Sequence, residues 1–155
     1  MTPLNPAQEA WNRLIDNGFS PAAQAAPDPF GAAAIAACFS CETGSGGLIG
    51  WLTVFPEIAT ADACATLHTI GANLAADELR TMVAWLGGDL PAATREERDA
   101  IIDRAERDDE PDETLSQQAE QELTIALQAH VEAHLAHYLA LPAPSGLSIS
   151  PPDAD

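Results

Sequence analysis

Apolar residues recur at spacings of three and four along almost the whole chain. Trp11, Leu14 and Ile15 show this spacing in the segment Pro6–Asn17, and it places them on one side of an α-helix. No segment shows the alternating pattern of a β-strand above this helical signal. We therefore expect an all-α, single-domain bundle of about seven helices over residues 1–141, followed by a flexible Pro- and Ser-rich tail over residues 142–155.

Capping residues and glycines predict where these helices begin and end. Asn5, Asp28 and Thr60 are expected to cap three helices, because short polar side chains accept hydrogen bonds from the free N–H groups of a first turn. Gly18 and Gly71 are expected to end two of them. The expected helices cover residues 6–17, 29–43, 60–71, 75–86 and 112–141, with a short buried helix after the glycines at 44–47 and an acidic helix after Thr94. The second of these is apolar on almost all sides, which suits the centre of a bundle.

Two short motifs are compatible with chemistry, but a structural role explains each of them better. The glycines at residues 44–47 lack the preceding strand and the following lysine of a phosphate-binding loop, so we expect a tight turn. Cys38 and Cys41 have C-x-x-C spacing, without a preceding strand or a second pair of zinc ligands. We interpret them as two buried structural cysteines, and a redox-sensing pair is the alternative.

The charge balance limits the partners of this chain. Its six basic residues are all arginine, against 24 acidic residues and a formal charge of −18, so direct binding to nucleic acid or to an anionic membrane is not expected. A partner selected by charge should be basic. The three cysteines lack a secreted disulfide pattern, and the alanine-rich residues 22–38 are interrupted by prolines and an aspartate. We expect neither a signal peptide nor a membrane span, and place the protein in a reducing bacterial cytoplasm.

Half of the net charge lies in residues 89–122. This segment holds 13 acidic residues and 4 arginines, a formal charge of −9. Thr94 and Glu97 form a sequence capping box that opens a helix, and Pro111 is expected to break it. Acidic residues at steps of three and four would then form a stripe along one face, continued across the bend: Glu96, Asp99, Asp103, Glu106, Glu110 and Glu113. Ile101, Ile102 and Ala105 lie on the other side, so the helix can pack and still display its carboxylates.

Two interpretations fit this stripe. Carboxylates at such spacing lie roughly 5 to 6 Å apart and repel each other, so the face opposes local stability. A solvated surface that keeps the protein soluble is the simpler interpretation. The other is a surface that imitates the regular negative charge of a duplex. The candidate partner-binding residues are then Glu96, Asp99, Asp103, Glu106, Asp108, Asp109, Glu110, Asp112 and Glu113.

Three histidines follow each other on the expected last helix. His130, His134 and His137 lie at i, i+4 and i+7, a spacing that can hold zinc. Because no second element offers further ligands, we interpret them as a pH-sensitive packing or interface face. His68 stands alone and is interpreted as structural. We predict no metal, no cofactor and no catalytic residue.

Several short segments resemble a known family. Its members have a Glu, then Asn-Gly-Gly-Phe-x-Gln and two apolar or aromatic residues, and the similar positions here are Glu42, Ser45, Gly46, Gly47, Leu48, Gly50, Trp51 and Leu52. Further similar segments are residues 61–72, 86–91, 95–98 and 123–134. Their order and spacing resemble the nineteen-kilodalton DNA mimic protein type over about residues 41–139. Ser45, Leu48 and Gly50 replace the family's Asn, Phe and Gln, and its aromatic residue is missing around Ala119.

The resemblance implies a function. It suggests an interaction protein, with a homodimer among the forms it implies, whose acidic surface occupies the DNA-binding face of a basic protein, with a helix-turn-helix regulator as the kind of target. An anti-restriction or anti-CRISPR protein would use the same physics on another target. The alternatives are an acidic module with broad affinity for basic proteins and, less favoured, a carboxylate- or histidine-dependent enzyme.

Overall fold

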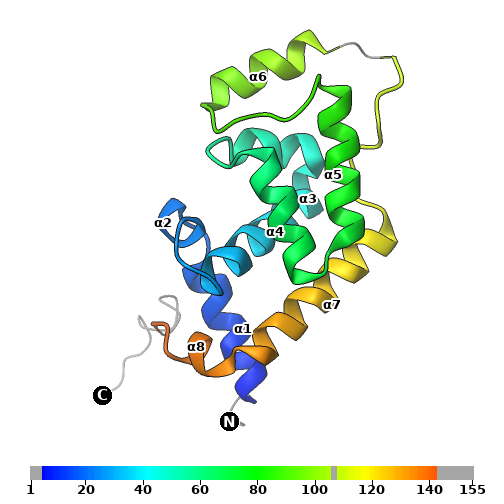
Figure 1. Cartoon of the computed structure of the whole chain (residues 1–155). Coiled ribbons are helices and arrows are strands. Elements are labelled where there is room, and N and C mark those ends of the chain that lie inside the picture. The colour runs from blue at the N-terminus through cyan, green and yellow to red at the C-terminus, as the bar shows by residue number, and fades with distance from the viewer. Residues whose placement is uncertain (1–4, 106–107, 143–155) are drawn as a thin grey trace.

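Eight α-helices and no strand make up the described part of the chain, residues 5–105 and 108–142 of a computed structural model. They are α1 (Pro6–Asn17), α2 (Pro21–Gln24), α3 (Phe30–Val54), α4 (Thr60–Ile70), α5 (Asn73–Trp85), α6 (Arg95–Arg104), α7 (Gln117–Ala133) and α8 (Leu135–Leu139) (Figure 1). The expected all-α architecture is confirmed. Asn5 caps α1 by accepting a hydrogen bond from the backbone N–H of Gln8 at 2.8 Å, and Gly18 follows its last residue, as the sequence predicted.

The alanine-rich helix α3 lies at the centre of the bundle. It packs against α1, α2, α4, α6 and α7, and most of its residues from Gly31 to Phe39 are buried. This confirms the central position expected from its apolar composition. By length and composition alone α3 could also cross a membrane, a property that core helices of folded proteins share.

A sharp bend in α3 occurs at Gly47. Its φ of 71° lies in the left-handed region, and a Cβ added there would meet the backbone oxygen of Glu113 at 2.7 Å. The next residue, Leu48, donates its backbone N–H to that same oxygen at 2.7 Å. The glycine turn is therefore structural, as predicted, and it leads into buried Leu48, Trp51 and Leu52.

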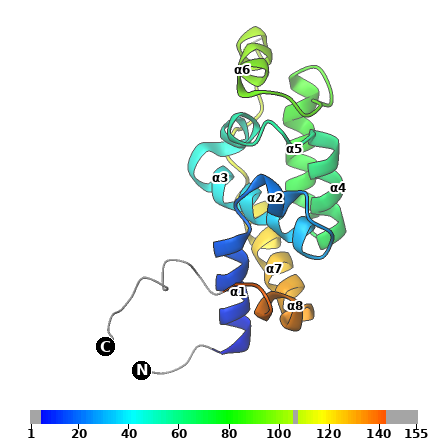
Figure 2. The same cartoon turned by 90° about the vertical axis from the view of Figure 1, so that its left-hand side faces the viewer.

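The two ends of the molecule are built from distant parts of the chain. Helix α6 lies at one end, and α1 with α8 lies towards the other (Figures 1 and 2). Arg13 joins α1 to α8, because its Nη1 donates to the carbonyl oxygens of Leu139 and Leu141 at 2.8 and 2.6 Å. Of the expected tail, only Pro142 is described, and its carbonyl oxygen accepts a hydrogen bond from Asn17 Nδ2.

Thr60 does not cap α4, contrary to the sequence prediction. Ala59 holds the N-cap position, and Thr60 is fully buried. Its Oγ1 accepts a hydrogen bond from Leu90 N at 2.8 Å, and its backbone N–H donates to Leu90 O at 2.9 Å. Thr60 thus joins α4 to the segment before α6. The other end of α4 follows the prediction, with Gly71 at φ 97°.

The expected single helix over residues 112–141 is two helices with an irregular start. Ser116 caps α7 by accepting from the N–H of Ala119 at 3.1 Å, so the helix begins five residues after Asp112. It ends at Ala133, because His134 leaves the helical region with φ −129° and ψ 34°. The short helix α8 then turns back against α1.

Candidate functional site

The capping box predicted for α6 is present. Thr94 Oγ1 accepts from Glu97 N at 3.2 Å, and Glu97 Oε1 accepts from Thr94 N at 2.8 Å. The helix ends at Arg104, because Ala105 has extended backbone angles. The expected continuation to Pro111 is wrong, and Glu110 and Glu113 do not share a helical face with Glu96. Further acids after Arg104 would lie at the negative end of the helix dipole, which disfavours helix extension.

Arg98 holds α6 to the rest of the protein from within the acidic segment. Its side chain has no exposed surface. Nη1 donates to Leu52 O at 2.9 Å, and Nη2 donates to Ile58 O and Pro91 O at 2.8 and 3.0 Å. Burial lowers the pKa of the Arg98 guanidinium, and the charge of Glu57 partly opposes this shift. The side chain joins three segments, and its charge is removed from the surface.

This role of Arg98 was not predicted, although the sequence contains a signal for it. Arg98 lies four residues before Ile102, which is buried at 8% exposure, so the arginine occupies the packing face of the helix. An arginine at such a position can donate hydrogen bonds to several backbone carbonyl groups at the edge of a core, because its guanidinium has five N–H donors.

Three carboxylates of the predicted stripe are displayed on the outer side of α6. Glu96, Asp99 and Asp103 follow at steps of three and four and are exposed. Within the described ranges none of the three makes an ion pair. Arg95 and Arg104 are exposed in the first and last turns of the same helix. Because buried Arg98 and Ile102 hold the inner side of α6 against the protein, the backbone that carries the three carboxylates is fixed in position.

The segment after α6 adds further carboxylates close to the body of the protein. Asp108, Asp109 and Asp112 are exposed, and Trp85 Nε1 donates to the backbone oxygen of Asp108 at 3.1 Å. Glu110 is half-buried and Glu113 is exposed, and both take part in interactions within the chain, so they are not counted in the acidic surface. Glu106 lies outside the described residues. We define the acidic surface as Glu96, Asp99, Asp103, Asp108, Asp109 and Asp112.

The three histidines do not form the predicted face of one helix, because the chain breaks at His134. His130 Nε2 lies 2.8 Å from Tyr138 Oη, which donates to Pro29 O at 3.1 Å, so His130 is the donor in the first bond. Burial lowers the pKa of His130, and the charge of His134 lowers it further. A hydrogen bond with the backbone of Pro29 and the negative charge of Asp28 act in the opposite direction. No group of three metal-ligating side chains occurs within residues 5–105 and 108–142.

The two cysteines of the C-x-x-C motif lie in different environments. Cys38 is fully buried and Cys41 is exposed, so the expectation of two buried cysteines is wrong for Cys41. Burial raises the pKa of Cys38 to about 12 and also raises the pKa of Cys41. Both thiols are therefore mostly protonated near neutral pH, which disfavours a reactive pair.

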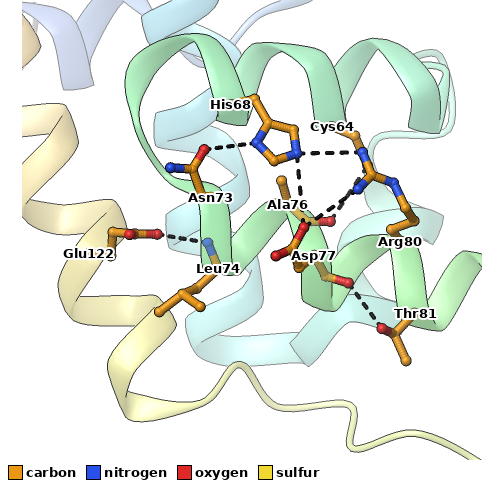
Figure 3. A network of polar contacts seen from close by, with 9 residues as sticks. All are labelled: Cys64, His68, Asn73, Leu74, Ala76, Asp77, Arg80, Thr81 and Glu122. Carbon is orange, nitrogen blue, oxygen red and sulfur yellow. Dashed lines mark hydrogen bonds and ion pairs between the residues drawn. The ribbon is translucent and has the colours of Figure 1, made fainter.

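His68 belongs to an exposed polar network between α4 and α5. Its Nδ1 lies 2.8 Å from Asn73 Oδ1, and Arg80 Nη2 lies 3.4 Å from its Nε2 (Figure 3). Arg80 also pairs with Asp77 at 3.5 Å. These contacts hold the start of α5 against the end of α4. Cys64, one turn before His68, is buried, and its thiol points to Ala76 O at 3.8 Å, so no activated nucleophile is formed.

Comparisons with known proteins add no relative. No family model, curated protein or solved structure matches this chain. The resemblance to DNA mimic proteins therefore stays a prediction from the sequence segments alone.

Proposed function

We propose that this protein binds the DNA-binding surface of a basic protein through its acidic surface and thereby prevents DNA from binding there. The observation that carries the proposal is the two-sided construction of α6. Arg98 and Ile102 anchor one side, and Glu96, Asp99 and Asp103 are exposed on the other. A surface that serves only solubility needs charge but no such fixed support.

Fixed carboxylates match what a DNA-binding face recognises. A duplex presents regularly spaced negative charge, and an arginine that donates hydrogen bonds to a phosphate can also donate two parallel hydrogen bonds to a carboxylate. The carboxylates on α6 lie roughly 5 to 6 Å apart, as expected for helical neighbours at steps of three and four. Asp108, Asp109 and Asp112 extend the charge beyond the helix, on a segment that Trp85 holds. The target is a basic DNA-binding protein, such as a helix-turn-helix regulator or a component of a restriction or CRISPR system.

A capture experiment tests whether this surface selects the partner. The wild-type chain and the variant E96Q/D99N/D103N are immobilised and exposed to lysate of the source cells. The matched control, D62N/E120Q/E132Q, removes three exposed negative charges from α4 and α7. We expect one basic DNA-binding protein to be retained by wild type and by the control and lost by the α6 variant. Equal retention by all three proteins would contradict the proposal.

A further inference from the structure

We propose that a patch around Ile125 on helix α7 binds a basic amphipathic helix of another protein, at a place separate from the acidic surface. Ile125 is the most exposed large apolar side chain of the described residues, at 66% exposure. Leu123 and Leu127, two positions before and after it, are buried, so the helix turns Ile125 away from the core. Its aliphatic surface is therefore presented to the solvent.

Apolar atoms of three helices surround Ile125. A shallow hollow beside it is lined by apolar residues of α4, its closing turn and α7: Ile70, Gly71, Ala126 and Ala129. A Cβ added to Gly71 would meet the Cβ of Ala126 at 3.8 Å, so the end of α4 lies directly against α7. Leu74, 39% exposed, adds apolar area at the start of α5. We define the Ile125 patch as Ile70, Gly71, Leu74, Ile125, Ala126 and Ala129.

The charge at the border of the Ile125 patch is negative. Glu122 lines the hollow just described, and its Oε1 accepts a hydrogen bond from Leu74 N at 2.7 Å, which places the carboxylate beside the apolar residues (Figure 3). Glu120 lines a second hollow that Ile125 also borders. None of the arginines within the described ranges lines either hollow. An apolar centre with carboxylates at its border is complementary to aliphatic side chains flanked by lysine or arginine.

Charge selects a basic protein, and not a second copy, as the occupant. Each copy carries a formal charge of −18. Two copies joined at this patch would bring Glu120 and Glu122 of both together, with no arginine in the hollows to pair with them. An anionic membrane would be repelled by the same carboxylates. A basic segment with aliphatic residues gains from the apolar centre and from its border.

The two hollows beside one projecting side chain suit a helix as the binding element. Side chains three or four positions apart on a helix lie roughly 5 to 6 Å from each other. Two aliphatic side chains one turn apart can therefore lie on either side of Ile125, one in each hollow, as ridges and grooves do between packed helices. Basic residues beside them would then face Glu120 and Glu122.

The Ile125 patch is distant from the acidic surface on α6. The turn between α4 and α5, which borders the patch, lies at the end of α5 that is farther from α6 (Figure 1). The two surfaces also recognise different chemistry, because the acidic surface offers charge alone and the patch offers an aliphatic anchor. The inference does not rest on the proposed function.

Synthetic peptides test the recognition. The probe is a short fluorescently labelled peptide of leucine and lysine, with its leucines at steps of three and four along one helical face. A second peptide has the same composition in an order that forms no apolar face, and it measures the general attraction of cations to this acidic protein. A third peptide replaces every lysine of the probe by glutamate. By anisotropy, we expect the probe to bind at least tenfold more tightly than the second peptide, and the third not to bind.

Variants of the protein test the residues. I125Q removes the aliphatic anchor and should abolish the difference between the first two peptides. V54Q is the matched control at another exposed aliphatic residue, 44% exposed, and should keep the full difference. E122Q removes a charge but keeps an oxygen for Leu74 N, and it should weaken probe binding about threefold. I125Q should still displace DNA from the partner of the acidic surface, so the two proposals can fail separately.

NMR with isotope-labelled protein locates the bound probe. The backbone amide signals of Gly71, Ile125 and Ala126 should shift most on titration. Shifts concentrated on α6, equal affinity for the first two peptides, or unchanged discrimination between them by I125Q would overturn the proposal. Sedimentation equilibrium of the protein alone tests the other occupant. A mass that rises with concentration in wild type but not in I125Q would show a second copy on the patch, and would equally overturn the proposal.

Discussion

Arg98 Nη1 donates a hydrogen bond to the carbonyl oxygen of Leu52 at 2.9 Å, across 46 positions of the chain. This bond joins the acidic helix α6 to the end of the central helix α3. Together with the bonds from Nη2 to Ile58 and Pro91, it makes a buried cation the support of an acidic surface. The orientation of the exposed carboxylates therefore depends on a positive charge that is fully buried.

Replacing Arg98 by methionine should lower the free energy of unfolding by about 3 to 5 kcal/mol, since three carbonyl oxygens lose their donors. Chemical denaturation measures the change. R95M removes an exposed arginine of the same helix and should change stability by less than about 0.5 kcal/mol. Equal stability of the two variants would show that the buried bonds are not the anchor.

Replacing Gly47 by valine should destabilise the protein by about 2 to 4 kcal/mol, because a left-handed conformation and a clash with Glu113 O at 2.7 Å add together. Gly44 is the control: it is helical, and a Cβ there meets nothing within 4 Å. G44A should be neutral or more stable by up to about 1 kcal/mol. Thermal melting compares the two, and an unchanged melting temperature in G47V would refute the account of the bend.

His130 should make stability depend on pH. Its pKa in the folded protein is below the ordinary value, so the unfolded chain binds the proton more readily. The contribution of His130 is therefore fully present above about pH 6.5 and decreases as the pH falls below that value. Urea denaturation of wild type and H130Q between pH 8 and pH 5 measures it. The stability of wild type relative to H130Q should fall with the pH, and a constant or rising difference would contradict the environment described for His130.

Local interactions could be predicted from the sequence, and distant ones could not. The Asn5 cap and the Thr94–Glu97 capping box involve residues three positions apart, so the sequence contains all the information for them. Thr60 was also predicted to be an N-cap, but its hydroxyl oxygen accepts a hydrogen bond from the backbone N–H of Leu90, thirty residues away. Its role depends on packing that only the folded chain defines.

The same distinction applies to the acidic surface. The spacing of Glu96, Asp99 and Asp103 predicted their shared face, because α6 is regular over these residues. The end of the helix at Arg104 was not predicted, since the bond from Trp85 to Asp108 and the bond from Leu48 to Glu113 fix the following segment from outside it. Half of the expected stripe therefore lies on a loop or outside the described residues.

Competition with DNA is the most direct measurement of the proposed function. The captured partner is bound to its fluorescently labelled DNA site, and the anisotropy is followed while this protein is added at several salt concentrations. Wild type should displace the DNA, and E96Q/D99N/D103N should need at least tenfold more protein, about 1.4 kcal/mol, with a weaker dependence on salt. D62N/E120Q/E132Q should match wild type. If the partner holds DNA and this protein at the same time, or if the three substitutions on α6 leave affinity and salt dependence unchanged, the acidic surface does not act as a substitute for DNA.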